Sequence, residues 1–188
     1  MTPDARGLAG ALRDAALLKG DFVLRSGRRS SYYLDKYRFG TRPDLLRPLG
    51  AAIAAAVRER EPDAVRLAAP ELGAVTLATA ASLELGLPFV IVRAKAKEHG
   101  TGNRIEGAFE HGDCACLVED VVTSGGAAIE AVEALREAGL RVSNAVCVVD
   151  REEGGVDALA RAAVRLWPLF TASELRQAEA TTGANPHG

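Results

Sequence analysis

The sequence predicts an α/β fold in which helices flank a central, mostly parallel β-sheet. Short apolar segments alternate with helical segments over most of the chain, a pattern typical of such folds. Hydrophobic residues make up 48% of the chain and charged residues 26%, which supplies enough apolar surface for a sizeable core. The length of 188 residues fits one domain of ordinary size, so we expect residues 1–188 to form a single domain.

The N-terminal segment departs from this alternation. Leu8, Leu12 and Ala15 recur at helical spacing and predict a helix over residues 5–18. Residues 22–39 carry β-branched and aromatic side chains on both sides of a Ser-Gly pair, which predicts a β-hairpin. We therefore expect a small N-terminal helix and hairpin beside the main sheet.

The remaining elements follow in sequence order. Pro43 suits the first position of a helix, and Pro48 predicts that this helix begins later or bends one turn further on. Thr171 or Ser173 should cap a last helix of about ten residues. The expected helices cover residues 43–60, 73–85, 127–138 and 156–162, and the expected strands cover 65–69, 89–92, 114–119, 142–149 and 164–170.

Charge and hydropathy exclude several classes of protein. The net charge is -2, whereas a dedicated nucleic-acid binder is usually basic. No apolar run reaches the roughly 18 residues of a membrane span. Asp4 and Asp14 interrupt the N-terminal segment, which is therefore expected to be a folded helix and not a signal peptide. We expect neither a nucleic acid nor a membrane as a partner.

The three cysteines, Cys114, Cys116 and Cys147, indicate a reduced protein. An odd number without a signal peptide favours free thiols in the cytoplasm. Cys114 and Cys116 could suggest a metal-binding pair, but Cys116 lies near the start of a buried apolar strand. We expect all three to pack as small core residues.

One segment combines features of a phosphate site and of a hydroxyl site. The apolar strand that contains Cys116 ends in two adjacent acids, Glu119 and Asp120, and a small-residue loop from Thr123 to Gly126 leads into a helix. Ligands of open α/β sheets bind at the carboxyl ends of strands. The helix N-terminus suits a phosphate, and the acids suit hydroxyl donors or magnesium. A sugar that carries a 5-phosphate satisfies both.

This segment, LVEDVVTSGG, resembles the phosphoribosyl pyrophosphate (PRPP) motif of the type I phosphoribosyltransferases. Three further segments are similar to the orotate phosphoribosyltransferases of that family, and all four lie in family order between residues 22 and 155. The resemblance implies a type I phosphoribosyltransferase fold in which residues 1–40 form part of a hood and residues 93–107 form a mobile catalytic loop. The three further segments are FVLRSGRRSSYY from Phe22, RAKAKEHG from Arg93 and VVDREEGG from Val148.

The resemblance implies that the chain transfers the phosphoribosyl group from PRPP to orotate, giving orotidine 5-monophosphate and pyrophosphate in UMP biosynthesis. Magnesium would be the cofactor, held mainly through PRPP and without direct protein ligands. The loop of one subunit would cover the site of its neighbour, which implies a homodimer with shared active sites.

The resemblance also assigns roles to residues. Glu119 and Asp120 would hold the ribose hydroxyls, and Lys97 and His99 would complete the catalytic set. Orotate would contact Tyr33, Leu34 and Thr123, and its carboxylate would bind the planar guanidinium of Arg151. PRPP would contact Arg25, Arg93, Lys97, His99, Glu119, Asp120, Val121, Val122, Thr123, Ser124, Gly125, Gly126 and Ala127.

Two positions depart from the family pattern. Ala94 stands where a lysine commonly follows the loop arginine, with Lys95 one place later. Leu72 stands where many members have a lysine before a glycine. These departures leave room for a PRPP-binding regulatory module with weak or no catalysis. A phosphoribosyltransferase for another base is a further alternative, although Arg151 favours an acidic base.

Overall fold

The computed structural model of the chain describes residues 5–23, 29–94 and 104–178. Its helices are α1 Ala5–Ala16, α2 Tyr37–Gly40, α3 Pro43–Arg60, α4 Gly73–Leu85, α5 Gly126–Glu137, α6 Gly155–Arg161 and α7 Ala172–Gln177. Its strands are β1 Leu17–Val23, β2 Arg29–Leu34, β3 Arg66–Pro70, β4 Phe89–Val92, β5 Ile105–Glu106, β6 Ala115–Val122, β7 Asn144–Asp150 and β8 Arg165–Thr171.

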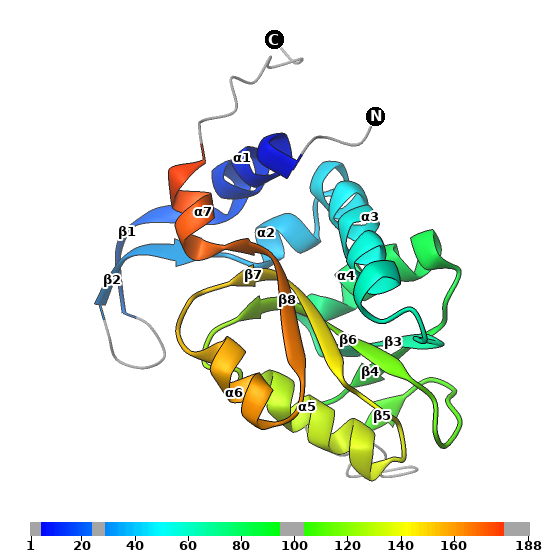
Figure 1. The fold of residues 1–188 in the computed structure, drawn as a ribbon. Helices are drawn as coiled ribbons and strands as arrows, with labels where there is room; N and C mark the ends of the chain where they lie inside the picture. The colour runs from blue at the N-terminus through cyan, green and yellow to red at the C-terminus, as the bar shows by residue number, and fades with distance from the viewer. Residues whose placement is uncertain (1–4, 24–28, 95–103, 179–188) are drawn as a thin grey trace.

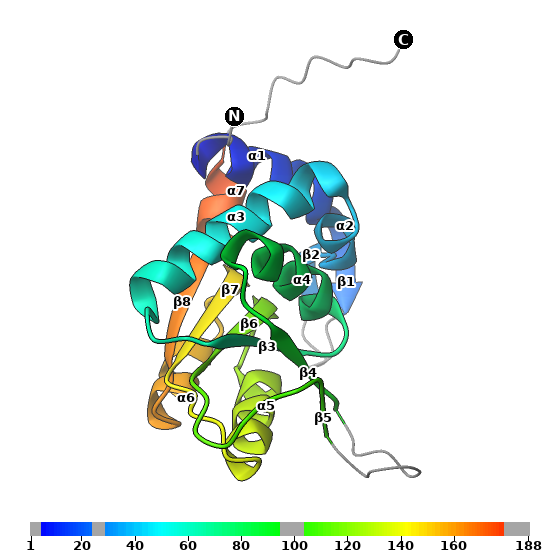
Figure 2. The same ribbon diagram turned by 90° about the vertical axis from the view of Figure 1, so that its right-hand side faces the viewer.

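The described residues form a six-stranded sheet in the order β5-β4-β3-β6-β7-β8. Neighbouring strands are parallel from β4 to β8, and only β5 at the edge is antiparallel. Helices α3 and α4 cover one face of the sheet, and α5 and α6 cover the other (Figures 1 and 2). The predicted α/β fold with a mostly parallel, helix-flanked sheet is therefore confirmed.

The sheet separates two apolar clusters, one on each face. Leu67 and Cys116 pack on the side of α3 and α4, whereas their neighbours Ala68 and Leu117 pack on the side of α5. This alternation follows from the pleat of a strand. Strands that are buried on both faces appear in the sequence as continuous apolar runs, which explains why the sequence identified them.

The three cysteines are free and buried, as predicted. Burial raises the pKa of the Cys116 thiol to about 12, so this side chain stays protonated at neutral pH. Within the described ranges, no three histidine, cysteine, aspartate or glutamate side chains gather in a group that could hold a metal ion.

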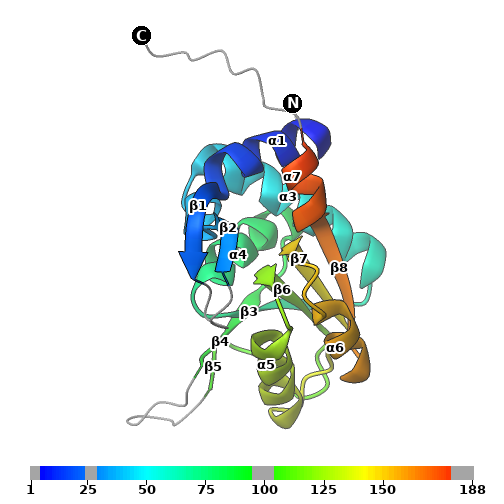
Figure 3. The same cartoon turned by 90° about the vertical axis from the view of Figure 1, so that its left-hand side faces the viewer.

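The N-terminal hairpin consists of the antiparallel strands β1 and β2, which lie beside α1 and α7 at one end of the molecule (Figures 1 and 3). Its predicted boundaries were wrong. The first strand begins at Leu17 because Leu17 pairs with Leu34 in the ladder, so the helix ends at Ala16. The second strand ends at Leu34, where the Asp35 carboxylate accepts a hydrogen bond from the Tyr37 N–H at 3.1 Å and starts α2.

Helix α3 runs from Pro43 to Arg60, as predicted, and does not begin later near Pro48, because the missing N–H of Pro48 affects only a carbonyl of the first turn. Two further segments differ from the prediction. Part of the segment 93–107 is the short strand β5, which pairs with β4, and residues 95–103 lie outside the described residues. The last helix, α7, has six residues, and Thr171 caps it as expected.

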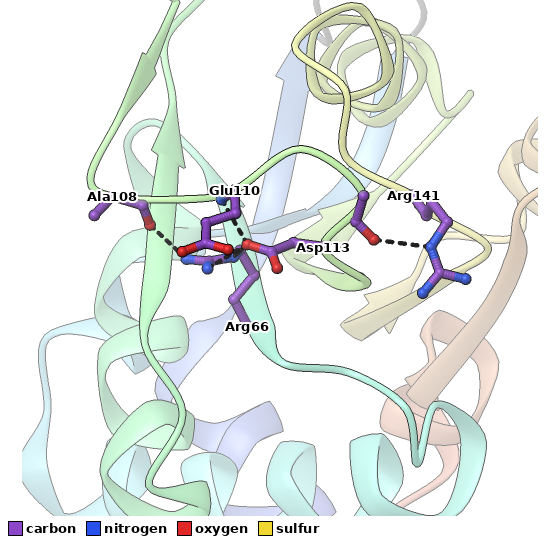
Figure 4. Close-up of polar contacts among 6 residues, drawn as sticks. Arg66, Ala108, Glu110, Asp113 and Arg141 are labelled. Atoms are coloured by element: carbon purple, nitrogen blue, oxygen red, sulfur yellow. Dashed lines mark hydrogen bonds and ion pairs between the residues drawn. The ribbon is translucent and has the colours of Figure 1, made fainter.

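A polar cluster closes the amino end of the sheet, opposite the predicted site (Figure 4). Arg66, which is 8% exposed, donates from Nε to the Asp113 carboxylate at 2.8 Å and from Nη1 to the Ala108 carbonyl. The same carboxylate accepts the Glu110 N–H at 2.7 Å, and the Arg141 guanidinium donates to the Gly112 carbonyl at 2.9 Å. These bonds fix the segment that leads into β6.

No helix in the described ranges is long and apolar enough to span a membrane.

Candidate active site

The two adjacent acids are buried in the central strand β6. Glu119 is 7% exposed and Asp120 is 2% exposed. The sequence placed them at the end of the strand, but β6 continues alongside β7 to Val122, and Lys36 and Gly73 lie against Asp120, so both acids are enclosed. Burial, with the neighbouring charge of Asp120, raises the pKa of Glu119 to about 8 against the opposing effect of Lys36. Glu119 is therefore largely protonated at pH 7.

Asp120 is paired with a lysine that the sequence analysis did not identify. The Lys36 Nζ lies 2.9 Å from Asp120 Oδ2, and Lys36 directly precedes α2 in the N-terminal segment. The contact is an ion pair by distance but lacks the angles of a good hydrogen bond. Burial lowers the pKa of Lys36, but the pairing with Asp120 outweighs it, so the pKa stands above its ordinary value. The N-terminal segment therefore brings a permanent positive charge to the acids.

Gly73, the first residue of α4, lies directly against this ion pair. A Cβ atom at Gly73 would lie 1.8 Å from Asp120 Oδ2 and 3.2 Å from Lys36 Cε. The position therefore accepts only glycine while the acid and the lysine hold their places. The preceding residue, Leu72, is 69% exposed and brings no charge to this edge of the sheet.

The loop after β6 has the geometry of a phosphate site. Thr123 and Ser124 are exposed, and Gly125 has a φ of +86° that favours glycine. No side chain caps the start of α5, so its first N–H groups and the positive end of its dipole face the loop. A Cβ at Gly155 would lie 2.6 Å from the Thr123 carbonyl oxygen, so the start of α6 supports the loop from the side of β7.

Arg151 connects the end of β7 to the hairpin. Its backbone N–H donates to the Val122 carbonyl at 2.9 Å, and its Nη2 lies 3.0 Å from the Glu153 carboxylate. Its Cζ lies 5.5 Å from the centre of the Tyr32 ring, and Arg176 donates to the Tyr32 hydroxyl at 3.0 Å. The Arg151 side chain is 10% exposed, and its Nε is buried without a hydrogen-bond partner in the described part of the chain.

Comparison with known proteins shows the family of this chain. Residues 42–166 match the family described as phosphoribosyl transferase domain. The orotate phosphoribosyltransferase of Halobacterium salinarum is 49% identical over 173 residues, which cover 92% of this chain and 97% of that protein.

The chain belongs to the orotate phosphoribosyltransferase family.

Solved structures agree with this assignment. The crystal structure of orotate phosphoribosyltransferase from Aeropyrum pernix matches with a TM-score of 0.80 and 34% identity, over 89% of this chain and 95% of that one. The Mycobacterium tuberculosis orotate phosphoribosyltransferase in complex with PRPP matches with a TM-score of 0.78 and 27% identity, over 93% of this chain and 99% of that one. The resemblance found in the sequence and the type I phosphoribosyltransferase fold are both confirmed.

The structure brings several of the predicted site residues together at the carboxyl edge of the sheet. The acids of β6, the phosphate loop and Arg151 adjoin one another through backbone contacts of Val122 and Thr123. Arg93 follows β4, where its Nη1 lies 3.5 Å from the Glu106 carboxylate and its Nε is buried without a hydrogen-bond partner among the described residues. Arg25, Lys97 and His99 lie outside the described residues.

The two predicted contacts of the pyrimidine ring differ in exposure. Tyr33 is 43% exposed, and its ring centre lies 5.7 Å from that of Phe22. Leu34 is 7% exposed and packs in the apolar cluster beneath the hairpin. Its contact with orotate stays a prediction.

The sequence analysis missed Lys36 and the close approach of Gly73. Lys36 follows an apolar, aromatic strand, and nothing in its local pattern distinguishes it from a solvated surface lysine. Glu71 was also not predicted, and its carboxylate accepts the N–H of Ala94 at 2.9 Å and so ties the turn after β3 to the end of β4. Both contacts join distant segments, so only the tertiary structure reveals them.

Proposed function

We propose that the chain catalyses transfer of the phosphoribosyl group from PRPP to orotate. The observation that carries this proposal is the end of β6. Glu119 and Asp120 lie there, and a short glycine-containing loop separates the strand from the N-terminus of α5, whose N-cap residue Gly125 has no side chain to cap it. The α5 N-terminus would bind the 5-phosphate, and the acids would accept the 2- and 3-hydroxyls of the ribose. Relatives that share up to 49% identity over nearly their full length are named as this enzyme, which disfavours a purely regulatory module.

In the reaction, the bond between C1 of the ribose and the pyrophosphate oxygen breaks, and the electron pair leaves with pyrophosphate. The bond between the orotate ring nitrogen and C1 forms. C1 therefore becomes cation-like while the leaving group gains negative charge. The negative charge of Asp120 would stabilise the sugar, and cations placed at the pyrophosphate would stabilise the leaving group.

Arg151 is the residue that would select orotate. Its side chain is largely buried between β7 and the hairpin, and its Nε lacks a partner in the described part of the chain. A guanidinium binds a carboxylate through two parallel hydrogen bonds. Orotate carries a carboxylate and uracil does not, so Arg151 would favour orotate between these pyrimidines.

Magnesium fits this site as a substrate-bound ion. The Asp120 carboxylate already faces Lys36, and Glu119 has a pKa that keeps it largely protonated at pH 7. We therefore infer that PRPP itself supplies most of the ligands of the metal. When bound, the ion offsets the charge of the pyrophosphate.

Three elements of the proposal rest on the sequence. Arg25, Lys97 and His99 are proposed as further cations at the pyrophosphate, and the segment 93–107 is proposed as the catalytic loop that covers the site of the partner subunit. A homodimer with shared sites follows from that loop. The cytoplasmic location inferred from the thiols stays a prediction.

A pyrophosphate-release assay tests the proposal. Purified protein is incubated with PRPP, magnesium and, in turn, orotate, uracil, adenine, guanine and hypoxanthine. Release of pyrophosphate with orotate and with none of the other bases supports the proposed reaction. Binding of PRPP without turnover on any base would indicate a regulatory module. Turnover on a purine would show that the purine, and not orotate, is the substrate.

A further inference from the structure

We propose that Lys36 is a PRPP-binding residue that pairs with Asp120 in the free protein and moves to the pyrophosphate group when the ribose hydroxyls take its place. This inference rests on the proposed function, because it assumes that Asp120 accepts the ribose hydroxyls.

The position of the ion pair allows Lys36 to leave Asp120. Asp120 is 2% exposed, whereas the Lys36 side chain is 38% exposed and can withdraw toward solvent. The Oδ1 atom of Asp120 accepts the N–H of Val121 at 2.6 Å, so Oδ2, the oxygen that faces Lys36, is the one left for a ligand. A ribose hydroxyl that reaches Asp120 must therefore displace or share the ammonium group.

The direction in which PRPP would lie brings its pyrophosphate group toward Lys36. The phosphate loop is supported by Gly155 on the side of β7, whereas Lys36 passes over Gly73 at the end of β3. Strands β3 and β7 lie on opposite sides of β6. In ribose, C1 lies across the ring from the carbon that carries the 5-phosphate arm. A sugar with its phosphate at α5 and its hydroxyls on the acids therefore presents C1 and the pyrophosphate toward β3, where Lys36 stands.

The carboxyl edge of the sheet near the start of α4 needs a positive charge that Lys36 can supply. Near the start of α4 the turn offers Leu72, an exposed apolar residue, and Glu71, whose carboxylate accepts the Ala94 N–H. A pyrophosphate at this edge needs a cation, and Lys36 brings one on a flexible four-carbon chain. Besides Asp120, the largely protonated Glu119 carboxyl and the Tyr37 ring, whose centre lies 5.7 Å from Nζ, face the ammonium group. Lys36 would thus compensate for the missing lysine at position 72.

The test compares two ligands that differ only in the pyrophosphate. Binding of PRPP and of ribose 5-phosphate is measured by calorimetry with magnesium for the unmodified protein, Lys36→Met and Lys36→Gln. Both variants should weaken PRPP binding by about ten- to a hundredfold, the scale of one charged hydrogen bond, and should leave ribose 5-phosphate binding unchanged or tighter. Lys36→Arg should restore part of the PRPP affinity.

The glutamine variant guards against loss of folding, because its amide can still donate to Asp120. Arg38→Met is the matched control, since Arg38 lies one helix position beyond Tyr37, is 54% exposed and pairs with Asp35. This control should change both affinities less than about twofold.

Two outcomes would overturn the proposal. Equal weakening of both ligands would make Lys36 a structural counter-ion of Asp120, and equal tightening of both would make it only a competitor of the ribose. These measurements need no turnover. If the unmodified protein binds PRPP but releases no pyrophosphate with orotate, the proposed reaction fails while the role of Lys36 is still decided by the two affinities.

Discussion

Replacing Glu119 by glutamine should stabilise the fold at neutral pH. The pKa of Glu119 is raised from an ordinary 4.5 to about 8, mainly by burial. Between these values the unfolded chain has released the proton and the folded chain keeps it. The unfolded state then binds fewer protons, so the free energy of unfolding falls as the pH rises from about 4.5 to about 8. Glutamine occupies the same volume and cannot ionise, so it removes this loss.

The magnitude follows from the distance between the two pKa values. At pH 7, about 2.5 pH units above the ordinary value, the loss is about 3 kcal/mol at roughly 1.4 kcal/mol per unit. At pH 5 it is under about 1 kcal/mol. Glu119→Gln should therefore exceed the unmodified protein in stability by about 3 kcal/mol at pH 7, which corresponds to roughly 6–12 °C in melting temperature for a chain of this size.

Urea unfolding at pH 5, 6, 7 and 8 measures this difference. Glu133→Gln, on an exposed position of α5, is the matched control and should follow the unmodified protein at every pH. Parallel pH profiles for Glu119→Gln and the unmodified protein would show that Glu119 is ionised in the folded state, and the argument from burial would be refuted.

Three further predictions concern the site. Arg151→Ala should weaken orotate by about 2–3 kcal/mol and PRPP much less, as measured by KM for each substrate; equal effects on both would exclude a carboxylate clamp. Gly73→Ala should lower the free energy of unfolding by roughly 1–3 kcal/mol and reduce turnover, because its Cβ would lie 1.8 Å from Asp120 Oδ2. Gly126→Ala, whose Cβ meets nothing within 4 Å, is the control for stability, and equal losses in the two variants would contradict the steric argument. Mixing inactive Asp120→Asn with inactive Lys97→Ala should restore roughly a quarter of the unmodified activity after subunit exchange, because each mixed dimer regains one intact site. If mass labelling proves exchange and activity stays at background, the loop acts within its own chain.

The sequence by itself determined the α/β class, the order of the helices and strands along the chain and the resemblance to the phosphoribosyltransferases. Buried parallel strands need uninterrupted apolar runs, and a helix that receives a phosphate needs small residues before it, so both features are written locally. For the same reason the glycine loop before α5 and the acids of β6 could be predicted as site residues from the sequence alone. The Thr171 cap of α7 was predictable because a capping box depends on residues three positions apart.

The tertiary structure decided what depends on contacts between distant segments. The hairpin boundaries shifted because the pairing of Leu17 with Leu34 outweighs the helical spacing of its neighbours. The burial of Glu119 and Asp120 arises from the continuation of β6 alongside β7 and from Lys36 and Gly73 packed against Asp120, which no local pattern specifies. Lys36 meets Asp120 across 84 positions of the sequence, and Gly73 accommodates both. A side chain's charge is local information, but its partner and its burial are set by packing, and these two quantities control its pKa and its chemistry.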